Sequence, residues 1–252
     1  MSVADFARKL GVKAGRVVRR QIPARWYPSW PNPVLAEALG PAATAKSDIH
    51  DHLATIFAEA VAARPRLIIE LGTRDGMSTR ALLAAGEIAG AHVLSIDIAD
   101  CAQLDLPQRF RARWSFVRAD DVAFAGEPFA AFCAARGQAA LADVIFVDTS
   151  HLYEHTRAEI AAWAPRLAPA GTMMFHDTNM ADGWFRKLDA KAERGWDNRR
   201  GVIRAIEELV GRRYDEATYF ADVASGYEIR HVPWSNGLTI MRRHGAGAGG
   251  SA

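Results

Sequence analysis

The sequence contains few cysteines and no long apolar run. Cys101 and Cys133 are the only cysteines among 252 residues, so a disulfide framework of the kind found in small secreted proteins is not expected. No window of about 18 uninterrupted apolar residues occurs, which argues against a transmembrane helix. The first residues also lack the continuous apolar stretch of a signal peptide. We therefore expect a cytoplasmic protein without a membrane partner.

An excess of charge of one sign is missing as well. The chain has 31 basic and 29 acidic residues, a formal net charge of +2. This balance argues against nucleic acid as the main partner. Hydrophobic residues, in contrast, make up 50% of the chain, enough to cover both faces of a buried sheet. The composition thus favours a single α/β unit over a disordered or fibrous protein.

Three regions follow from the local patterns. Residues 1–46 are expected to form an N-terminal helix and a Pro- and aromatic-rich extension, 47–243 the main domain, and 244–252 a flexible tail. Within the main domain, short β-rich runs alternate with helical patterns. The expected strands are Leu67–Leu71, His92–Ile96, Ser115–Arg118, Asp143–Val147, Thr172–Phe175, Tyr227–Val232 and Leu238–Arg242; the expected helices begin near Ser47, Ser78, Pro128 and Tyr153, with a long helical segment over 181–210.

This alternation predicts a doubly wound, mostly parallel, seven-stranded α/β sheet, because strand–helix–strand crossovers give parallel neighbours. The turn signal Asn236-Gly237 lies between the last two strands and predicts an antiparallel C-terminal hairpin. Residues 181–200 interrupt the rhythm and carry Trp184 and Trp196. We interpret them as a substrate-covering insertion, with core-packing aromatics as the alternative.

The loop after the first strand indicates a cofactor site. Gly72 and Gly76 allow a sharp turn and a close approach of a ligand to the backbone. A dinucleotide fingerprint would need a further glycine, but Arg74 lies between them. The carboxylates of Glu70 and Asp75 flank the loop; they would repel a diphosphate, yet suit a cofactor with ammonium and sulfonium charges.

The next two strands also end in acidic residues. Asp97 follows the second strand, where a carboxylate can accept hydrogen bonds from both hydroxyls of a ribose. Asp120 and Asp121 follow the third, where an Asp can accept from an exocyclic adenine amino group. Because ligands of open α/β sheets lie beyond the carboxyl ends of the strands, the three strand ends could contact one adenosine-containing ligand.

Together these motifs resemble the class I S-adenosylmethionine (SAM)-dependent methyltransferases, over residues 47–243. The run Glu70-x-Gly72-x-x-x-Gly76-x-Ser78 is similar to the first motif of that family. The resemblance implies SAM as the cofactor. Its implied contacts are Glu70, Gly72, Thr73, Arg74, Gly76, Ser78, Asp97, Asp120, Asp121 and Asp148.

The fourth and fifth strands point to the reaction site. Asp148 and Asp177 follow them and should meet at one sheet edge, where two hard oxygen ligands suit Mg²⁺. Such an ion could hold a hydroxyl substrate, lower its pKa and orient its oxygen. His151, three residues after Asp148, is a suitable general base.

This segment resembles the methyltransferase group that contains macrocin O-methyltransferase-like and cephalosporin-hydroxylase-like proteins. Several members hold a divalent metal on strand-end acids, which implies Asp148, Asp177 and His176 as ligands here. Two differences stand out: catechol-type O-methyltransferases have an Asn at the position of Thr178, and some relatives have a carboxylate at the position of His176. His176 could therefore be a ligand, a second base or a structural residue. The motif residues are Asp148-x-Ser150-His151-x-Tyr153-Glu154 and His176-Asp177-Thr178.

We therefore predict a SAM-dependent methyltransferase, most simply a metal-assisted O-methyltransferase acting on a hydroxyl of a natural-product-like or sugar-like small molecule. His151 would be its general base, with Asp148 beside it. The alternatives are a metal-independent N- or O-methyltransferase and a non-catalytic SAM-fold accessory protein of a hydroxylase system. A dehydrogenase is disfavoured by the incomplete glycine fingerprint. A homo-oligomer is expected from the N-terminal extension, which could cover a neighbouring subunit's site.

Overall fold

The computed structural model describes Trp30 and residues 32–44, 47–180, 183–185, 192–194 and 200–244. The helix expected over residues 1–20, most of the aromatic extension, Trp196 and the expected tail from residue 245 lie outside these described residues. In the part of the chain that is described, no helix is both long and apolar enough to span a bilayer.

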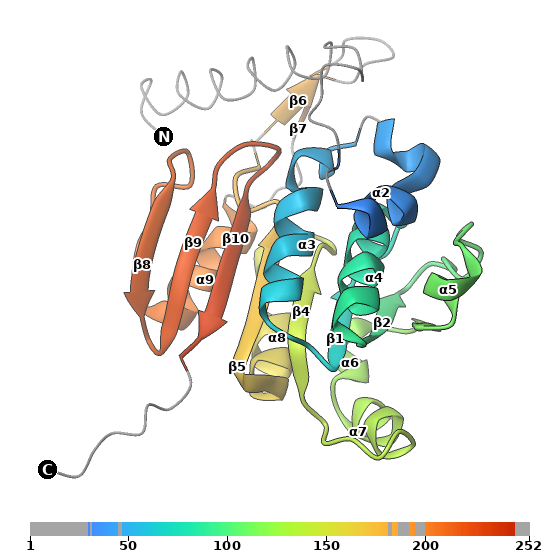
Figure 1. The fold of residues 1–252 in the computed structure, drawn as a ribbon. Coiled ribbons are helices and arrows are strands. Elements are labelled where there is room, and N and C mark those ends of the chain that lie inside the picture. The colour runs from blue at the N-terminus through green and yellow to red at the C-terminus, as the bar shows by residue number, and fades with distance from the viewer. Residues whose placement is uncertain are drawn as a thin grey trace, which may run out of the picture.

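Eight strands form one sheet in the order β3-β2-β1-β4-β5-β10-β9-β8 (Figure 1). The first five in this order are parallel, and the last three join antiparallel to their neighbours. The doubly wound α/β prediction with its antiparallel C-terminal hairpin is thus confirmed. The bounds are β1 Leu67–Leu71, β2 His92–Asp97, β3 Trp114–Arg118, β4 Ala142–Val147, β5 Leu167–His176, β8 Phe220–Ala224, β9 Tyr227–Val232 and β10 Leu238–Arg243.

Helices cover both faces of the sheet, as Figure 1 shows with α3 and α4 in front and α8 and α9 behind. One apolar cluster joins α2, α3, α4 and α5 to the front face, and another joins α7, α8 and α9 to the back. The central strands alternate their side chains between these clusters, since successive residues of a strand point to opposite faces. The helices are α2 Pro33–Leu39, α3 Leu53–Ala62, α4 Met77–Ala89, α5 Gln108–Arg111, α6 Asp121–Phe124, α7 Glu127–Ala134, α8 Tyr153–Trp163 and α9 Gly201–Val210, with 3-10 turns η2 Gly40–Thr44, η3 His50–His52 and η4 Ala164–Arg166.

The structure differs from the sequence prediction in several places. The helices α2, α5 and α6 were not predicted, and α2 lies in the stretch expected to be an irregular extension. β8 is an eighth strand, on the edge of the sheet, and its first four residues alternate between half-buried and exposed positions before the buried Ala224. The helix expected from Ser47 begins only at Leu53, after η3. The expected long helical segment over 181–210 contains the short antiparallel strands β6 Gly183–Phe185 and β7 Ala192–Arg194 and then α9.

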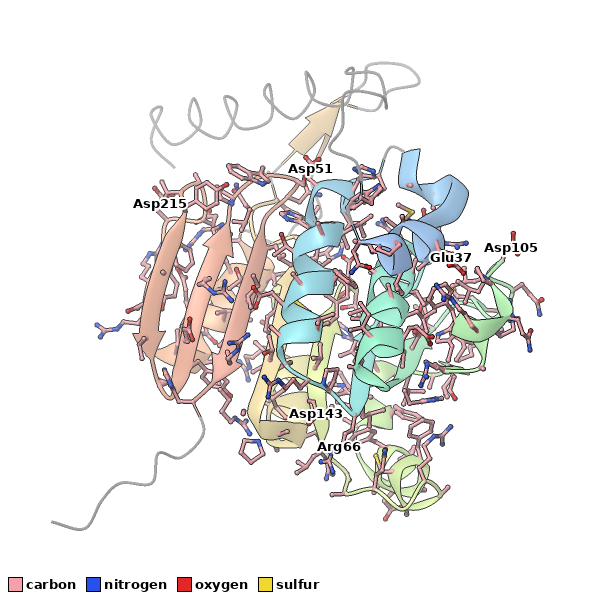
Figure 2. The ribbon with its side chains drawn as sticks, viewed as in Figure 1. Glu37, Asp51, Arg66, Asp105, Asp143 and Asp215 are labelled. Atoms are coloured by element: carbon pink, nitrogen blue, oxygen red, sulfur yellow. The ribbon has the colours of Figure 1, made fainter. Side chains whose placement is uncertain are left out.

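The two ends of the parallel strands have different chemistry. At the amino end, the carboxylate of Asp143 accepts hydrogen bonds from the backbone amides of Arg66, at 2.7 Å, and Leu67, at 3.1 Å, which fixes the start of β1 beside β4. Figure 2 shows Arg66 and Asp143 at this end and Asp51 at the opposite, carboxyl end. The predicted site residues follow the carboxyl ends, as expected for an open α/β sheet.

Candidate active site at the carboxyl edge of the sheet

The loop after β1 contacts the end of β4 at Gly72. Gly72 has φ +84, and a Cβ atom there would overlap the backbone carbonyl of Asp148. The amide of Asp148 in turn donates to the carbonyl of Leu71, at 2.9 Å. Only glycine fits this close approach, because it has no Cβ and tolerates positive φ. Gly76, with φ +75 at the start of α4, is likewise closed in, here by Leu104.

Asp97 holds the same loop from the end of β2. Its half-buried carboxylate accepts hydrogen bonds from the backbone amides of Thr73, at 2.7 Å, and Arg74, at 3.2 Å. The other oxygen accepts from the amide of Ala99, at 2.8 Å. The ribose-binding residue expected from the sequence therefore also fixes the conformation of the glycine loop.

Glu70 lies beneath the loop rather than at its surface. Its fully buried carboxylate accepts hydrogen bonds from the hydroxyls of Ser78, Thr79 and Ser95, at 2.6, 2.8 and 2.5 Å. Burial raises the pKa of Glu70 to about 7, against the opposing effect of these hydroxyls. Glu70 and Ser78 thus connect β1, β2 and the first turn of α4, which positions the loop without requiring contact with a ligand.

Arg74 has a partner that the sequence did not reveal. Its guanidinium contacts both carboxylate oxygens of Asp48, at 2.9 and 3.4 Å. The hydrogen bond that Arg74 donates to Asp48 is the main reason that the pKa of Arg74 is raised. Asp48 lies 26 positions earlier, before η3, and no motif marks it. The pair ties the segment before η3 to the glycine loop.

Asp120 and Asp121 have different surroundings although they are adjacent. Asp120 is exposed, and its side chain caps α6 by accepting from the amide of Ala123, at 2.8 Å. Asp121 is buried and turns toward His155 and Glu159 of α8. Of the two, only Asp120 is therefore open to a ligand at the surface.

The residues after β4 and β5 form one compact site. Nε2 of His151 lies 3.1 Å from Oδ1 of Asp148 and 2.9 Å from Oδ2 of Asp177. All three residues are buried, with Asp177 only 2% exposed. Their potential ligand atoms lie within 4.8 Å of one another, close enough to surround a single metal ion. The structure thus brings together the base and the two acids expected from the sequence.

His176 lies behind this trio. Its Nδ1 is 3.2 Å from Oδ1 of Asp148, and its Nε2 is 3.0 Å from the backbone carbonyl of Ser235. Both ring nitrogens thus have protein partners, so the geometry supports a role in orienting Asp148 over the expected role as a ligand. A histidine that binds a carbonyl through one nitrogen has its ring orientation and tautomer fixed.

The site concentrates charge in a buried volume. Burial alone would lower the pKa of His151, but Asp148 and Asp177 outweigh it and raise that pKa to about 9. The same two carboxylates raise the pKa of His176 well above its usual value, again against burial. Burial would raise the pKa of each carboxyl group, but the imidazoles lower both.

A second layer of residues supports His176 and was missed from the sequence. The ring of His52 packs edge-on against it, with centroids 5.5 Å apart. Nε2 of His52 lies 2.8 Å from the carbonyl of Trp234, and the hydroxyl of Ser235 donates to Asp51, at 2.8 Å. Burial, followed by the charge of His176, lowers the pKa of His52 to about 3. The contacts of this layer with Trp234 and Ser235 join residues more than 180 positions apart, so no local pattern could indicate them.

A comparison with known protein families points to the same region of the chain. Residues 69–178 match the family model of a methyltransferase domain. That range begins inside β1 and ends just after Asp177, so it contains both the glycine loop and the acid–histidine trio. No curated protein is similar enough in sequence to count as a relative.

Solved structures share the fold at low sequence identity. Cofactor-bound Rv0187 from MTB aligns with a TM-score of 0.56 at 18% identity, over 84% of this chain and 90% of that one. TomG from Streptomyces achromogenes, an O-methyltransferase solved with SAM, gives 0.53 at 16% identity, over 85% and 91%. The methyltransferase MycE, solved with Mg, S-adenosylhomocysteine and mycinamycin VI, gives 0.54 at 16%, over 88% of this chain and 57% of MycE.

Residues 69–178 thus match a methyltransferase domain, and the chain has the fold of solved methyltransferases. Both findings agree with the resemblance of its motifs to SAM-dependent methyltransferases.

Proposed function

We propose that the protein methylates a hydroxyl group of a small natural-product-like or sugar-like acceptor, with a divalent cation bound beside the methyl donor. The observation that carries this proposal is the buried trio Asp148, His151 and Asp177, in which the imidazole contacts both carboxylates. The proposal agrees with the O-methyltransferase TomG and the Mg-containing MycE complex among the proteins of similar fold.

The residues of the trio fit a divalent cation. Oδ1 of Asp177 is buried and has no hydrogen-bond partner within the described part of the chain. A buried carboxylate oxygen without a partner is costly unless a cation or proton satisfies it. The two carboxylates are hard oxygen donors of the kind that Mg²⁺ or Mn²⁺ binds. Asp148 and Asp177 would hold the ion.

The chain's own groups then account for the transfer. Bound SAM would supply the methyl group: the acceptor oxygen would bond to the methyl carbon as the carbon–sulfur bond breaks, and the sulfur would keep the electron pair and leave as S-adenosylhomocysteine. The hydroxyl proton passes to Nε2 of His151. When bound, a divalent cation would hold the acceptor oxygen, lower its pKa and offset the carboxylates that keep His151 protonated. His176 fixes the orientation of Asp148.

We assign the donor side to the glycine loop and the neighbouring strand ends. Asp97 would bind the ribose while keeping its hold on the amides of Thr73 and Arg74. Asp120, exposed at the start of α6, would face the adenine. Gly72 places this loop directly against Asp148, so donor and acceptor would meet where the two loops touch.

Labelled SAM and a panel of hydroxylated small molecules test the proposal. We expect label transfer to an acceptor, loss of transfer with EDTA, and recovery with added Mg²⁺. Asp177→Asn should lose the Mg²⁺ response while still binding SAM. Unchanged methyl transfer in the presence of EDTA would show that the reaction needs no metal ion, and the assignment of a methyltransferase would still hold. Folded protein that binds SAM and methylates nothing would instead support the accessory-protein alternative. The small-molecule partner and the homo-oligomer remain predictions.

A further inference from the structure

A second cluster of metal-ligand side chains lies outside the trio. Asp121 is the first residue of α6, and His155 and Glu159 are one turn apart on α8. Nε2 of His155 lies 3.2 Å from Oδ1 of Asp121 and 3.6 Å from Oε1 of Glu159. One potential ligand atom from each residue lies within 4.8 Å of the others.

The two carboxylates of this cluster are buried together without enough positive charge. Asp121 is 5% exposed and Glu159 is 0% exposed. Among the described residues, His155 is the only cationic group that contacts either one. Oδ2 of Asp121 and Oε2 of Glu159 are buried and accept no hydrogen bond from a donor group in the described part of the chain. The two carboxyl groups lie close enough to each other to share a proton. Two such oxygens need a proton or a cation, because burial of an unpaired carboxylate is costly.

We propose that Asp121, His155 and Glu159 bind a Zn²⁺ ion separate from the cation at the reaction site. Ligands about 2.1 Å from a tetrahedral zinc ion lie ~3.4 Å from one another, which matches both distances from His155. An imidazole among the ligands favours Zn²⁺ over Mg²⁺, which prefers oxygen alone. His155, with 29% of its side chain exposed, leaves a path from solvent.

The position of the cluster gives the ion a structural role. The hydroxyl of Thr149, the residue after Asp148, donates to Oε1 of Glu159 at 2.7 Å. The indole of Trp163 on α8 donates to the backbone carbonyl of Asp121, at 3.1 Å. A zinc ion would therefore join the start of α6, next to Asp120, to the loop that follows β4. Both loops border the proposed cofactor site.

Zinc stoichiometry tests the proposal directly. Full-length protein without an affinity tag is dialysed against Zn²⁺ at a fixed free concentration, and bound zinc is measured by mass spectrometry. We expect His155→Gln to bind one Zn²⁺ fewer per chain than the wild type. Glu159→Gln, which can still accept from Thr149, should lose the same single ion. Because each variant is compared with the wild type, any zinc bound at the reaction-site trio contributes equally to both and does not affect the difference.

The control is His92→Gln, which removes a half-buried histidine whose Nε2 lies 2.9 Å from the hydroxyl of Ser115 and which belongs to neither cluster. This variant should keep the wild-type stoichiometry. Circular dichroism in the absence of metal checks that each variant is folded. Replacement of His155, the most exposed of the three ligands, should disturb folding least. Co²⁺ should give visible absorption bands in the wild type that weaken in His155→Gln. Equal zinc binding by the wild type and His155→Gln, or no binding by either, would overturn the proposal. A proton shared between Asp121 and Glu159 would then explain how the two buried acids are stabilised.

Discussion

Nε2 of His151 lies 2.9 Å from Oδ2 of Asp177, and both residues have left-handed backbone conformations, with φ 59 and 58. Such conformations cost a residue other than glycine on the order of 1–3 kcal/mol each, and they persist where the surrounding structure imposes them. The loops after β4 and β5 thus hold this pair together at the expense of local strain, which is typical of a functional site.

Replacement of the proposed base should separate chemistry from binding. His151→Gln is expected to lower kcat by roughly 10²–10⁴-fold, the usual contribution of a general base, and to leave SAM affinity unchanged. Single-turnover kinetics and calorimetry measure the two quantities. His92→Gln is the matched control and should retain activity. A His151→Gln enzyme with the wild-type kcat would exclude His151 as the base.

The close contact at Gly72 predicts a large effect from a single methyl group. Gly72→Ala would meet the carbonyl of Asp148 and hold a strained φ, so we expect a loss of SAM binding and a lower melting temperature. Gly137→Ala is the control, because Gly137 has φ +64 but nothing within 4 Å of its added Cβ. It should cost only the backbone strain, about 1–2 kcal/mol. Equal effects of the two substitutions would show that the contact with Asp148 has no importance.

Asp97 should contribute to SAM affinity through the loop as well as through the ribose. Asp97→Asn replaces one acceptor oxygen with a donor and removes the charge that strengthens the bonds from Thr73 and Arg74. We expect SAM to bind about 10- to 100-fold more weakly, the range for one charge-assisted hydrogen bond. Asp100→Asn, at an exposed position nearby, is the control. Calorimetric titration with SAM that distinguishes neither variant from wild type would contradict this role.

Stability should fall in mild acid because of His231. Burial lowers the pKa of this histidine to about 4, and its ring lies between the hydroxyl of Thr239 and the carbonyl of Glu216. In the unfolded chain the pKa is about 6.5, so between these values the unfolded state binds a proton that the native state excludes. Stability therefore decreases as the pH falls from about 6.5 to 4, by at most roughly 3 kcal/mol from this residue.

Urea unfolding at several pH values measures this dependence. His231→Gln should have a shallower pH dependence than the wild type, whatever its stability at neutral pH. His52 shifts in the same direction and remains in both proteins, so the difference between the two slopes belongs to His231. Parallel slopes would refute the assignment.

Local patterns were sufficient for most of the fold. β1 and β9 begin and end where the apolar runs predicted, because their residues are buried either continuously or in alternation. β8 was missed because Phe220–Ala224 is short and has Asp222 at its centre. The late start of α3 had a similar cause: Ser47 resembles a helix cap, but η3 intervenes before Leu53. Edge strands and short turns depend on tertiary contacts more than on their own sequence.

The candidate site was predictable where chemistry follows a strand end. Asp148, His151 and Asp177 are close together because β4 and β5 are adjacent and parallel. The sequence could not show that Asp121 turns inward while Asp120 remains exposed. Nor could it pair Arg74 with Asp48, since that contact depends on how the segment before α3 folds back. Such long-range contacts are set by the assembled fold.

The edge strand β8 has a consequence for solubility. Among the described strands, β8 pairs only with β9, so its outer side presents backbone groups to solvent. Val223 is 61% exposed on this strand, and open strand edges of this kind can pair with those of other molecules. Asp222 places a negative charge at the middle of the strand, which opposes such lateral association because two copies would repel each other. Asp222, which interrupts the apolar pattern of β8, thus disfavours pairing of this edge strand with another molecule.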